Sequence, residues 1–145
     1  MNSNLIFWPV LTQIALTLVG FMILGIRKAK AIRTKNVDRQ KAALDNDAWP
    51  DYVLQVSNNI RNQFQIPVLF YVLCFISHSL GVISYALLSL AWAFVVSRVV
   101  HAYVHMTSNY VPARFGVFTI GFVILLLMFM LAAGSLITNQ SFANI

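Results

Sequence analysis

The chain has 145 residues, of which 59% are hydrophobic and only 10% are charged, and its formal net charge is +6. A soluble domain usually carries about 25% charged residues, so the composition excludes a soluble protein. With 6 glycines and 4 prolines, it also excludes a collagen-like or disordered chain. Because a spanning helix needs about 20 apolar residues, we expect one integral membrane domain over 1–145 with at most four spans.

The apolar segments predict four membrane-spanning helices. The second is expected to begin with polar turns near Val53 and to be kinked by Pro67, since proline removes one helical hydrogen bond. Residues 139–145 are expected to form a polar tail. No segment alternates at period two, which excludes a β-barrel. The predicted fold is an all-α four-helix membrane bundle, with spans at about 5–26, 60–79, 82–106 and 114–138 and a polar loop at about 28–52.

The positive charges predict how the chain crosses the membrane. Seven of the ten Lys and Arg residues directly follow the first span, in the order Arg27, Lys28, Lys30, Arg33, Lys35, Arg39 and Lys41. Cytoplasmic segments of membrane proteins carry the excess of positive charge, and with both termini outside all ten cations lie on the cytoplasmic side. The basic segment is therefore expected to meet lipid headgroups. No basic and aromatic surface of the kind that binds nucleic acid is present.

The acidic residues exclude several kinds of active site. Asp38, Asp45, Asp47 and Asp51 are the only four in the chain, so no carboxylate side chain follows Tyr52. Carboxylate dyads, Ser-His-Asp triads and acidic proton relays are therefore not expected. The single cysteine, Cys74, lies in an apolar run, where we expect a buried and unreactive thiol.

Four polar residues form one face of the second helix. Asn58, Arg61, Asn62 and Gln65 follow the spacing i, i+3, i+4, i+7, which places them on the same side of a helix. Polar side chains at membrane depth are candidates for a functional site. Asparagine and glutamine there can also bond other helices structurally, but four aligned residues favour a binding face.

The third helix carries a second polar face, formed by Arg98, His101 and His105 at i, i+3 and i+7. Two histidines at i, i+4 can hold a metal, but no carboxylate or cysteine is available to complete the shell, so we expect no metal site. A histidine that bonds a neighbouring helix is the simpler interpretation of His101.

Arg114 follows Pro112 at the start of the fourth helix, where a proline fits because its missing N–H is not needed. It is either a site residue or an anchor that reaches the headgroups. A site of arginines and amides beside lipid suits an anionic, water-soluble molecule that meets an apolar one. Arginine pairs with carboxylates, and a nearby arginine favours a thiolate, the nucleophilic form of a thiol. That thiol would come from a bound cofactor.

These residues resemble the MAPEG family, the membrane-associated proteins in eicosanoid and glutathione metabolism. The run NQFQIPVLFY at 62–71 looks like the helix-two signature of that family, and 98–114 is similar to its segment from helix three into helix four. The resemblance, closest to small bacterial members, implies a homotrimer in a bacterial inner membrane, with glutathione bound between subunits near the cytoplasmic side. It also implies that Arg114 stabilises the glutathione thiolate and that Arg61 and Asn62 hold the tripeptide.

The chain differs from the family pattern at four positions. Gln65 stands where the family has a glutamate that binds the α-amino group of glutathione, and Asn58 stands where an arginine is common. His105 occupies a ring-hydroxyl position, and Phe115 replaces a serine. The leading hypothesis is a glutathione-dependent transferase or peroxidase that acts on lipophilic electrophiles, in which Arg114 favours the thiolate and the tripeptide is positioned by Arg61, Asn62, Gln65 and Arg98. The alternative is a non-enzymatic member that binds a lipid, another amphiphile or a partner protein in the same cleft. A transporter, which would need midplane ionisable groups and internal repeats, ranks last.

Overall fold

The computed structural model describes residues 2–143, and within this range the regular structure is helical. Four helical stretches are long and apolar enough to cross a membrane: Ser3–Arg33, Asp51–Ser79, Tyr85–Met106 and Val111–Thr138. Large apolar side chains such as Trp8, Met22 and Phe129 are exposed along them, as they are where helices face lipid. The predicted four-helix membrane fold is therefore confirmed.

The first span consists of η1 (Ser3–Ile6), capped by the side chain of Asn2, followed by α1 (Phe7–Arg33). This helix continues past its apolar part, and its last turn holds Lys30 and Arg33, which suits the negative end of the helix dipole. It ends because Lys35 adopts a left-handed conformation with φ 55°. Two short helices follow, α2 (Arg39–Ala42), capped by Asp38, and η2 (Asn46–Ala48), capped by Asp45. The residues at 39–41 thus do not extend the first helix.

The second span is broken into two helices rather than kinked. Helix α3 covers Asp51–Gln63 and α4 covers Ile66–Ser79. Gln65 leaves the helical region with φ −105° and ψ −100°, and Pro67 lies in the first turn of α4. Proline is accepted there because a first-turn N–H has no partner within the helix. The predicted kink at Pro67 is therefore a full interruption that separates a polar helix from an apolar one.

The third and fourth spans are continuous helices. A turn at Gly81, with φ +67°, leads to α5 (Tyr85–Met106), whose first turn is capped by the Ser84 hydroxyl. The last helix, α6, covers Val111–Ala143. It is longer at both ends than the predicted 114–138. The residues expected in a polar tail at 139–145 are helical as far as Ala143, and 144–145 lie outside the described residues.

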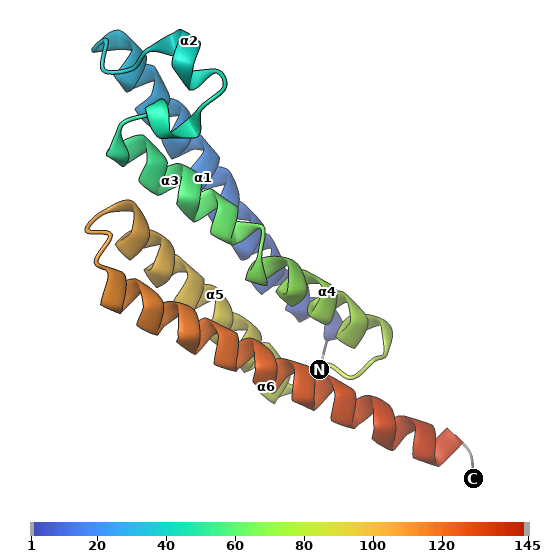
Figure 1. Ribbon diagram of the computed structural model, residues 1–145. Coiled ribbons are helices and arrows are strands. Elements are labelled where there is room, and N and C mark those ends of the chain that lie inside the picture. The colour runs from blue at the N-terminus through green and yellow to red at the C-terminus, as the bar shows by residue number, and fades with distance from the viewer. Residues whose placement is uncertain (1, 144–145) are drawn as a thin grey trace.

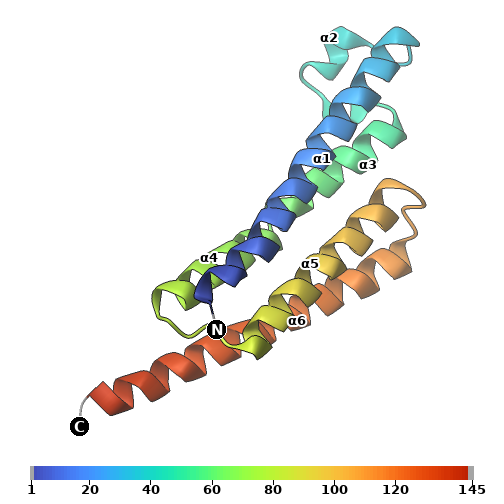
Figure 2. The same cartoon turned by 180° about the vertical axis from the view of Figure 1, so that it is seen from behind.

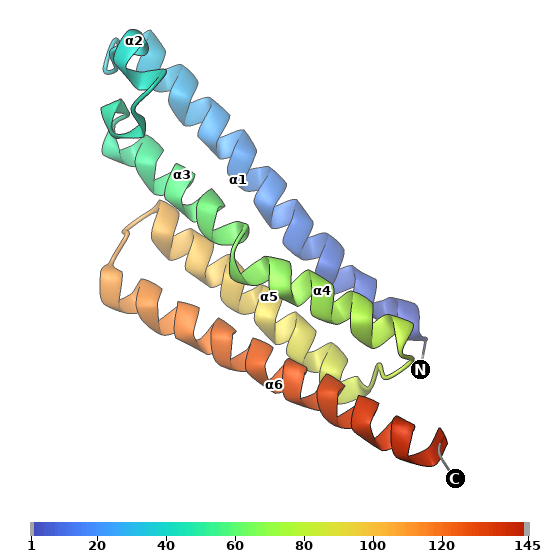
Figure 3. The ribbon, with the colours of Figure 1, turned by 45° about the vertical axis from the view of Figure 1, so that its right-hand side comes forward.

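The helices form two pairs that lie side by side. Helix α1 runs along α3 and α4, and α5 runs along α6 (Figures 1 and 2). Both described ends of the chain lie at one end of the bundle, and α6 extends beyond the other helices there (Figure 3). The opposite end, called the basic end below, contains the end of α1, α2, the start of α3 and the connection at 107–110.

Different contacts hold the two ends together. Away from the basic end, apolar side chains from α4, α5 and α6 form a core in which the rings of Phe70 and Phe94 stack at 4.6 Å between their centroids. At the basic end, Arg27 of α1 donates hydrogen bonds to the carbonyls of Tyr52 (2.5 Å) and Met106 (2.9 Å). This arginine, expected only to flank the membrane, therefore connects α1, α3 and α5 beside the site.

Candidate functional site

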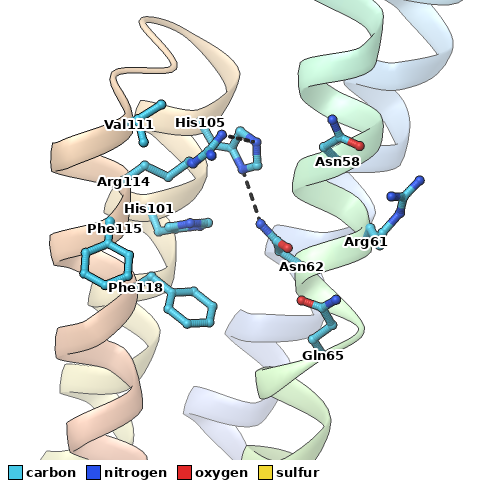
Figure 4. A pocket seen from close by; sticks show the side chains of 10 residues that line it. All are labelled: Asn58, Arg61, Asn62, Gln65, His101, His105, Val111, Arg114, Phe115 and Phe118. Carbon is cyan, nitrogen blue, oxygen red and sulfur yellow. Dashed lines mark hydrogen bonds between the residues drawn. The ribbon is translucent and has the colours of Figure 1, made fainter. Parts of the chain in front are cut away.

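A cleft of about 470 Å³ lies between α3 on one side and α5 and α6 on the other, in the half of the bundle next to the basic end (Figure 4). The volume falls within the range of about 300–1,000 Å³ that is typical of small-molecule sites. Seven of the eight residues predicted for the site line it, together with three apolar residues that were not predicted. The lining consists of Asn58, Arg61, Asn62, Gln65, His101, His105, Val111, Arg114, Phe115 and Phe118.

Arg114 is held in the cleft by two neighbours. One of its terminal nitrogens, Nη1, donates to the side-chain oxygen of Asn109 at 2.7 Å and to Nε2 of His105 at 3.2 Å. Asn109 can take this position because it adopts a left-handed conformation, with φ 51°, which asparagine tolerates better than most residues. Arg114 is half-buried, and these bonds direct it into the cleft rather than toward headgroups.

His105 lies between the two walls of the cleft. Its Nε2 atom accepts from Arg114, because a guanidinium group can only donate, and its Nδ1 atom lies 3.5 Å from Nδ2 of Asn62 on α3. Figure 4 shows this chain of contacts from α6 through α5 to α3. His105 thus lies between Arg114 and the polar face of α3 and contacts both.

The polar face of α3 lines the opposite wall, as the helical spacing predicted. Asn58, Arg61 and Gln65 are exposed, whereas Asn62 is half-buried. Arg61 lines the cleft, but in Figure 4 its guanidinium group points away from Arg114 and from the α5 and α6 wall.

Arg98 lies beneath the cleft instead of lining it. Its side chain is fully buried (0% exposed), and Nη2 lies 3.4 Å from Nδ1 of His101. The guanidinium carbon is 5.7 Å from the centre of the Phe118 ring, and both His101 and Phe118 line the cleft. Nε and Nη1 of Arg98 have no hydrogen-bond partner among the described residues. The arginine therefore contributes positive charge from below, and His101 bonds it rather than a neighbouring helix.

A buried amide cluster supports α3 from the side of α1. Nε2 of Gln13 donates to Oε1 of Gln63 at 2.7 Å, and Nε2 of Gln63 donates to Oδ1 of Asn59 at 3.5 Å. All three side chains are buried. Since Gln63 is the last residue of α3, this cluster fixes the helix where it ends and thereby orients Asn62 and Gln65.

Some site residues were missed, although the sequence contained a signal for them. Phe118 follows Arg114 by four residues and therefore lies one turn further along the same face of the helix. Asn109 lies in the connection between α5 and α6, five residues before Arg114. Tyr103 and Tyr110, which lie near the connection between α5 and α6, are 69% and 61% exposed and do not line the cleft. Among the described residues, no group of three or more His, Cys, Asp or Glu lies close enough to hold a metal.

The fold and the cleft together define a four-span helical membrane protein with a cationic site between its helices. The sequence profile of the MAPEG family matches residues 5–134 of the chain. The protein therefore belongs to the MAPEG family, whose membrane proteins include glutathione-related transferases and peroxidases. No curated protein and no solved structure matches the chain.

Proposed function

We propose that this protein is a glutathione-dependent transferase or peroxidase that acts on lipophilic electrophiles at the membrane. The observation that carries the proposal is the position of Arg114, which is fixed by Asn109 and His105 and directed into a cleft without a carboxylate. A guanidinium group stabilises a thiolate beside it. That the thiol belongs to glutathione and that the second substrate is lipophilic are inferred from the family and from the residues that line the cleft.

The donor set fits glutathione, which carries two carboxylates, two peptide groups and a thiol. Arg61 and Arg114 both line the cleft, and their guanidinium groups suit a carboxylate and a thiolate. Asn58, Asn62 and Gln65 supply amide donors and acceptors for peptide groups. Arg98 would act through His101, which it holds from beneath, as a positioning residue.

The residues of the chain would perform the reaction by charge stabilisation and exclusion of water. Arg114 would stabilise the negative charge on sulfur when the thiol proton leaves to water, and His105 would keep the guanidinium in place. Phe115 and Phe118 would cover the sulfur from the α6 side. When bound, glutathione supplies the thiolate, which forms a bond to an electrophilic carbon as the leaving group departs with its electrons. With a peroxide, the thiolate would attack the outer oxygen, the O–O bond would break to release an alcohol, and a second glutathione would convert the resulting sulfenic acid to the disulfide and water.

A neighbouring apolar cavity explains why the second substrate would be lipophilic. This cavity of about 320 Å³ lies between α4 and α6. Leu69 and Phe122, which line it, each follow a cleft residue, Gln65 and Phe118, by four positions, so it begins one helical turn further from the basic end. An electrophile could enter it from the lipid and reach the thiolate. The proposed assembly is a homotrimer in a bacterial inner membrane, with the basic end in the cytoplasm.

Calorimetry of the detergent-solubilised protein with glutathione, combined with assays using chlorodinitrobenzene and cumene hydroperoxide, tests the proposal. We expect binding at millimolar glutathione or below. In Arg114→Ala, we expect kcat/KM to fall about 10²–10³-fold, the usual effect of removing one charge-stabilising donor. No binding at millimolar glutathione, or unchanged activity in Arg114→Ala, would contradict it. A lipid that co-purifies in the cleft without thiol chemistry would instead indicate the non-enzymatic alternative.

A further inference from the structure

His101 presents a hydrogen-bond donor to the cleft. Its Nδ1 atom lies 3.4 Å from Nη2 of Arg98. Since a guanidinium group can only donate, Nδ1 accepts, and the hydrogen of the neutral ring is therefore on Nε2. A second proton on Nδ1 would lie against the guanidinium group, so Arg98 keeps the ring in this form. Nε2 has no hydrogen-bond partner among the described residues, and the ring lines the cleft although the residue is only 1% exposed (Figure 4).

No other donor on this side of the cleft is both free and fixed. The two ring nitrogens of His105 already contact neighbouring side chains, and Phe115 and Phe118 are apolar. On the opposite wall, Gln65 is exposed and its side chain has no hydrogen bond within the described part of the chain, so a ligand would have to order it. Donors that are fixed before charge develops stabilise that charge best, which favours His101.

The position of His101 along the bundle relates this donor to both substrates. His105 contacts Arg114, and His101, one turn further from the basic end, contacts Phe118 with 6.0 Å between the ring centres. The apolar cavity between α4 and α6 includes Phe122, one turn further again. An electrophile that enters from this cavity therefore reaches His101 before Arg114. Because the rings of His101 and His105 are 5.5 Å apart, a small electrophile can contact His101 and a sulfur held at Arg114 at the same time.

Attack on a hydroperoxide develops charge at this level of the cleft. A bond forms between sulfur and the outer oxygen, the O–O bond breaks, and its electron pair stays on the inner oxygen as an alkoxide, which takes a proton from water. In-line attack puts the inner oxygen on the side away from the sulfur, where the organic group extends into the apolar cavity. His101 lies on that side of Arg114. A neutral imidazole can stabilise an oxygen anion by a hydrogen bond without losing its own proton.

We propose that His101 is a catalytic residue, which donates a hydrogen bond through Nε2 to the leaving oxygen of an organic hydroperoxide. This inference rests on the proposed function and narrows its substrate class. The electrophiles that the site accelerates most are those that leave charge on oxygen, with their organic group in the apolar cavity. Arg98 is then a positioning residue, because it determines which ring nitrogen carries the hydrogen.

Kinetics with two electrophiles at saturating glutathione test the role of His101. Cumene hydroperoxide leaves an alkoxide, whereas hexyl iodide leaves iodide, whose diffuse charge is little stabilised by a hydrogen bond. In His101→Phe, the ratio of kcat/KM for the hydroperoxide to kcat/KM for the iodide should fall about 10²-fold, the effect of losing one such donor. Both reactions use the same thiolate, so a change in glutathione affinity cancels in this ratio. His101→Gln retains an N–H donor and should restore most of it.

Further variants make the outcomes distinguishable. His78→Phe changes a histidine of α4 that lines neither the cleft nor the apolar cavity, and it should keep the ratio of the wild type. Thermal unfolding checks that each variant is folded. If His101→Phe does not fold, Arg98→Met tests the same donor, because it releases the ring, and its ratio should also fall.

A leaving-group series gives a second measurement. With para-substituted cumene hydroperoxides, the rate of the His101 variant should depend more steeply on the acidity of the leaving alcohol than the rate of the wild type. An unchanged ratio in His101→Phe, or an equal loss with both electrophiles, means that the role of His101 is wrong and that the proposed function stands. If the wild type reacts with neither electrophile, both proposals are wrong.

Discussion

The two halves of the bundle bury different kinds of side chain. In the half away from the basic end, the core consists of apolar residues such as Phe70, Cys74 and Met128, all 0% exposed. From the middle of the bundle, where Gln13 contacts Gln63, to the basic end, the buried side chains include Gln13, Asn59, Gln63, Arg98, His101 and His105. Several polar atoms of this second set have no partner among the described residues, namely Oε1 of Gln13, Nδ2 of Asn59, and Nε and Nη1 of Arg98.

Because of this difference, one half of the bundle stabilises the protein and the other half provides its candidate site. Burying a polar group without a partner costs free energy, and a charge at membrane depth costs more. The apolar half therefore stabilises the bundle, whereas the polar half lowers its stability in order to provide a cationic site. The break between α3 and α4 at residues 64–65 is where one kind of packing changes into the other.

The largest expected effect on stability is in the apolar half. Phe70→Ala removes a ring that is fully buried and stacked on Phe94, and it should destabilise the protein by about 3 kcal/mol through the cavity it leaves. Thermal unfolding in detergent measures the loss. Glutathione affinity of the folded protein, measured at low temperature, should be unchanged. A large loss of affinity together with an unaltered unfolding temperature would reverse the proposed division between the halves.

Arg98→Met is expected to have the opposite effect, at a smaller magnitude. The substitution replaces a buried guanidinium, two of whose nitrogens have no hydrogen-bond partner among the described residues, with an apolar side chain of similar length. Such replacements are often stabilising, here by about 1–2 kcal/mol. Thermal unfolding should shift upward while calorimetry shows weaker glutathione binding, because His101 loses its support. If Arg98→Met unfolds at a lower temperature than the wild type, the buried charge contributes to stability, and the claim that the polar half lowers stability is wrong.

The smallest expected effect is at the contact between α5 and α6. A Cβ atom added at Gly121 would lie 2.8 Å from Oγ of Ser97, so Gly121→Ala should cost about 1 kcal/mol through local displacement. Gly116, on the same helix, has no atom within 4 Å of an added Cβ, and Gly116→Ala should be neutral or stabilising. The difference between the unfolding temperatures of these two variants measures how closely α5 and α6 approach each other beside Arg98. Equal temperatures would show that the two helices do not pack tightly there.

The sequence was sufficient to predict the four spans, because the length of an apolar run and its flanking charges depend on the bilayer rather than on tertiary contacts. The helix boundaries were harder to predict from the sequence. The interruption at Gln65 depends on where Pro67 is best placed in a helix, and the end of α1 depends on the left-handed Lys35. Neither is visible in hydropathy, so a broken span was predicted as a kinked one.

The site was predictable to the extent that it follows helical periodicity. Asn58, Asn62 and Gln65 line one wall of the cleft, as their spacing on one face indicated. The position of Arg98 beneath the floor, and the bond from Asn109 to Arg114, depend on how α5 and α6 pack and how their connection turns.

The most direct test of the central claim is the ultraviolet absorbance of bound thiolate, measured while glutathione is titrated into the solubilised protein near neutral pH. The account predicts a saturable thiolate band in the wild type, absent in Arg114→Ala and partly restored in Arg114→Lys. Binding by calorimetry without a thiolate band, or a band of the same size in Arg114→Ala, would contradict the role of Arg114.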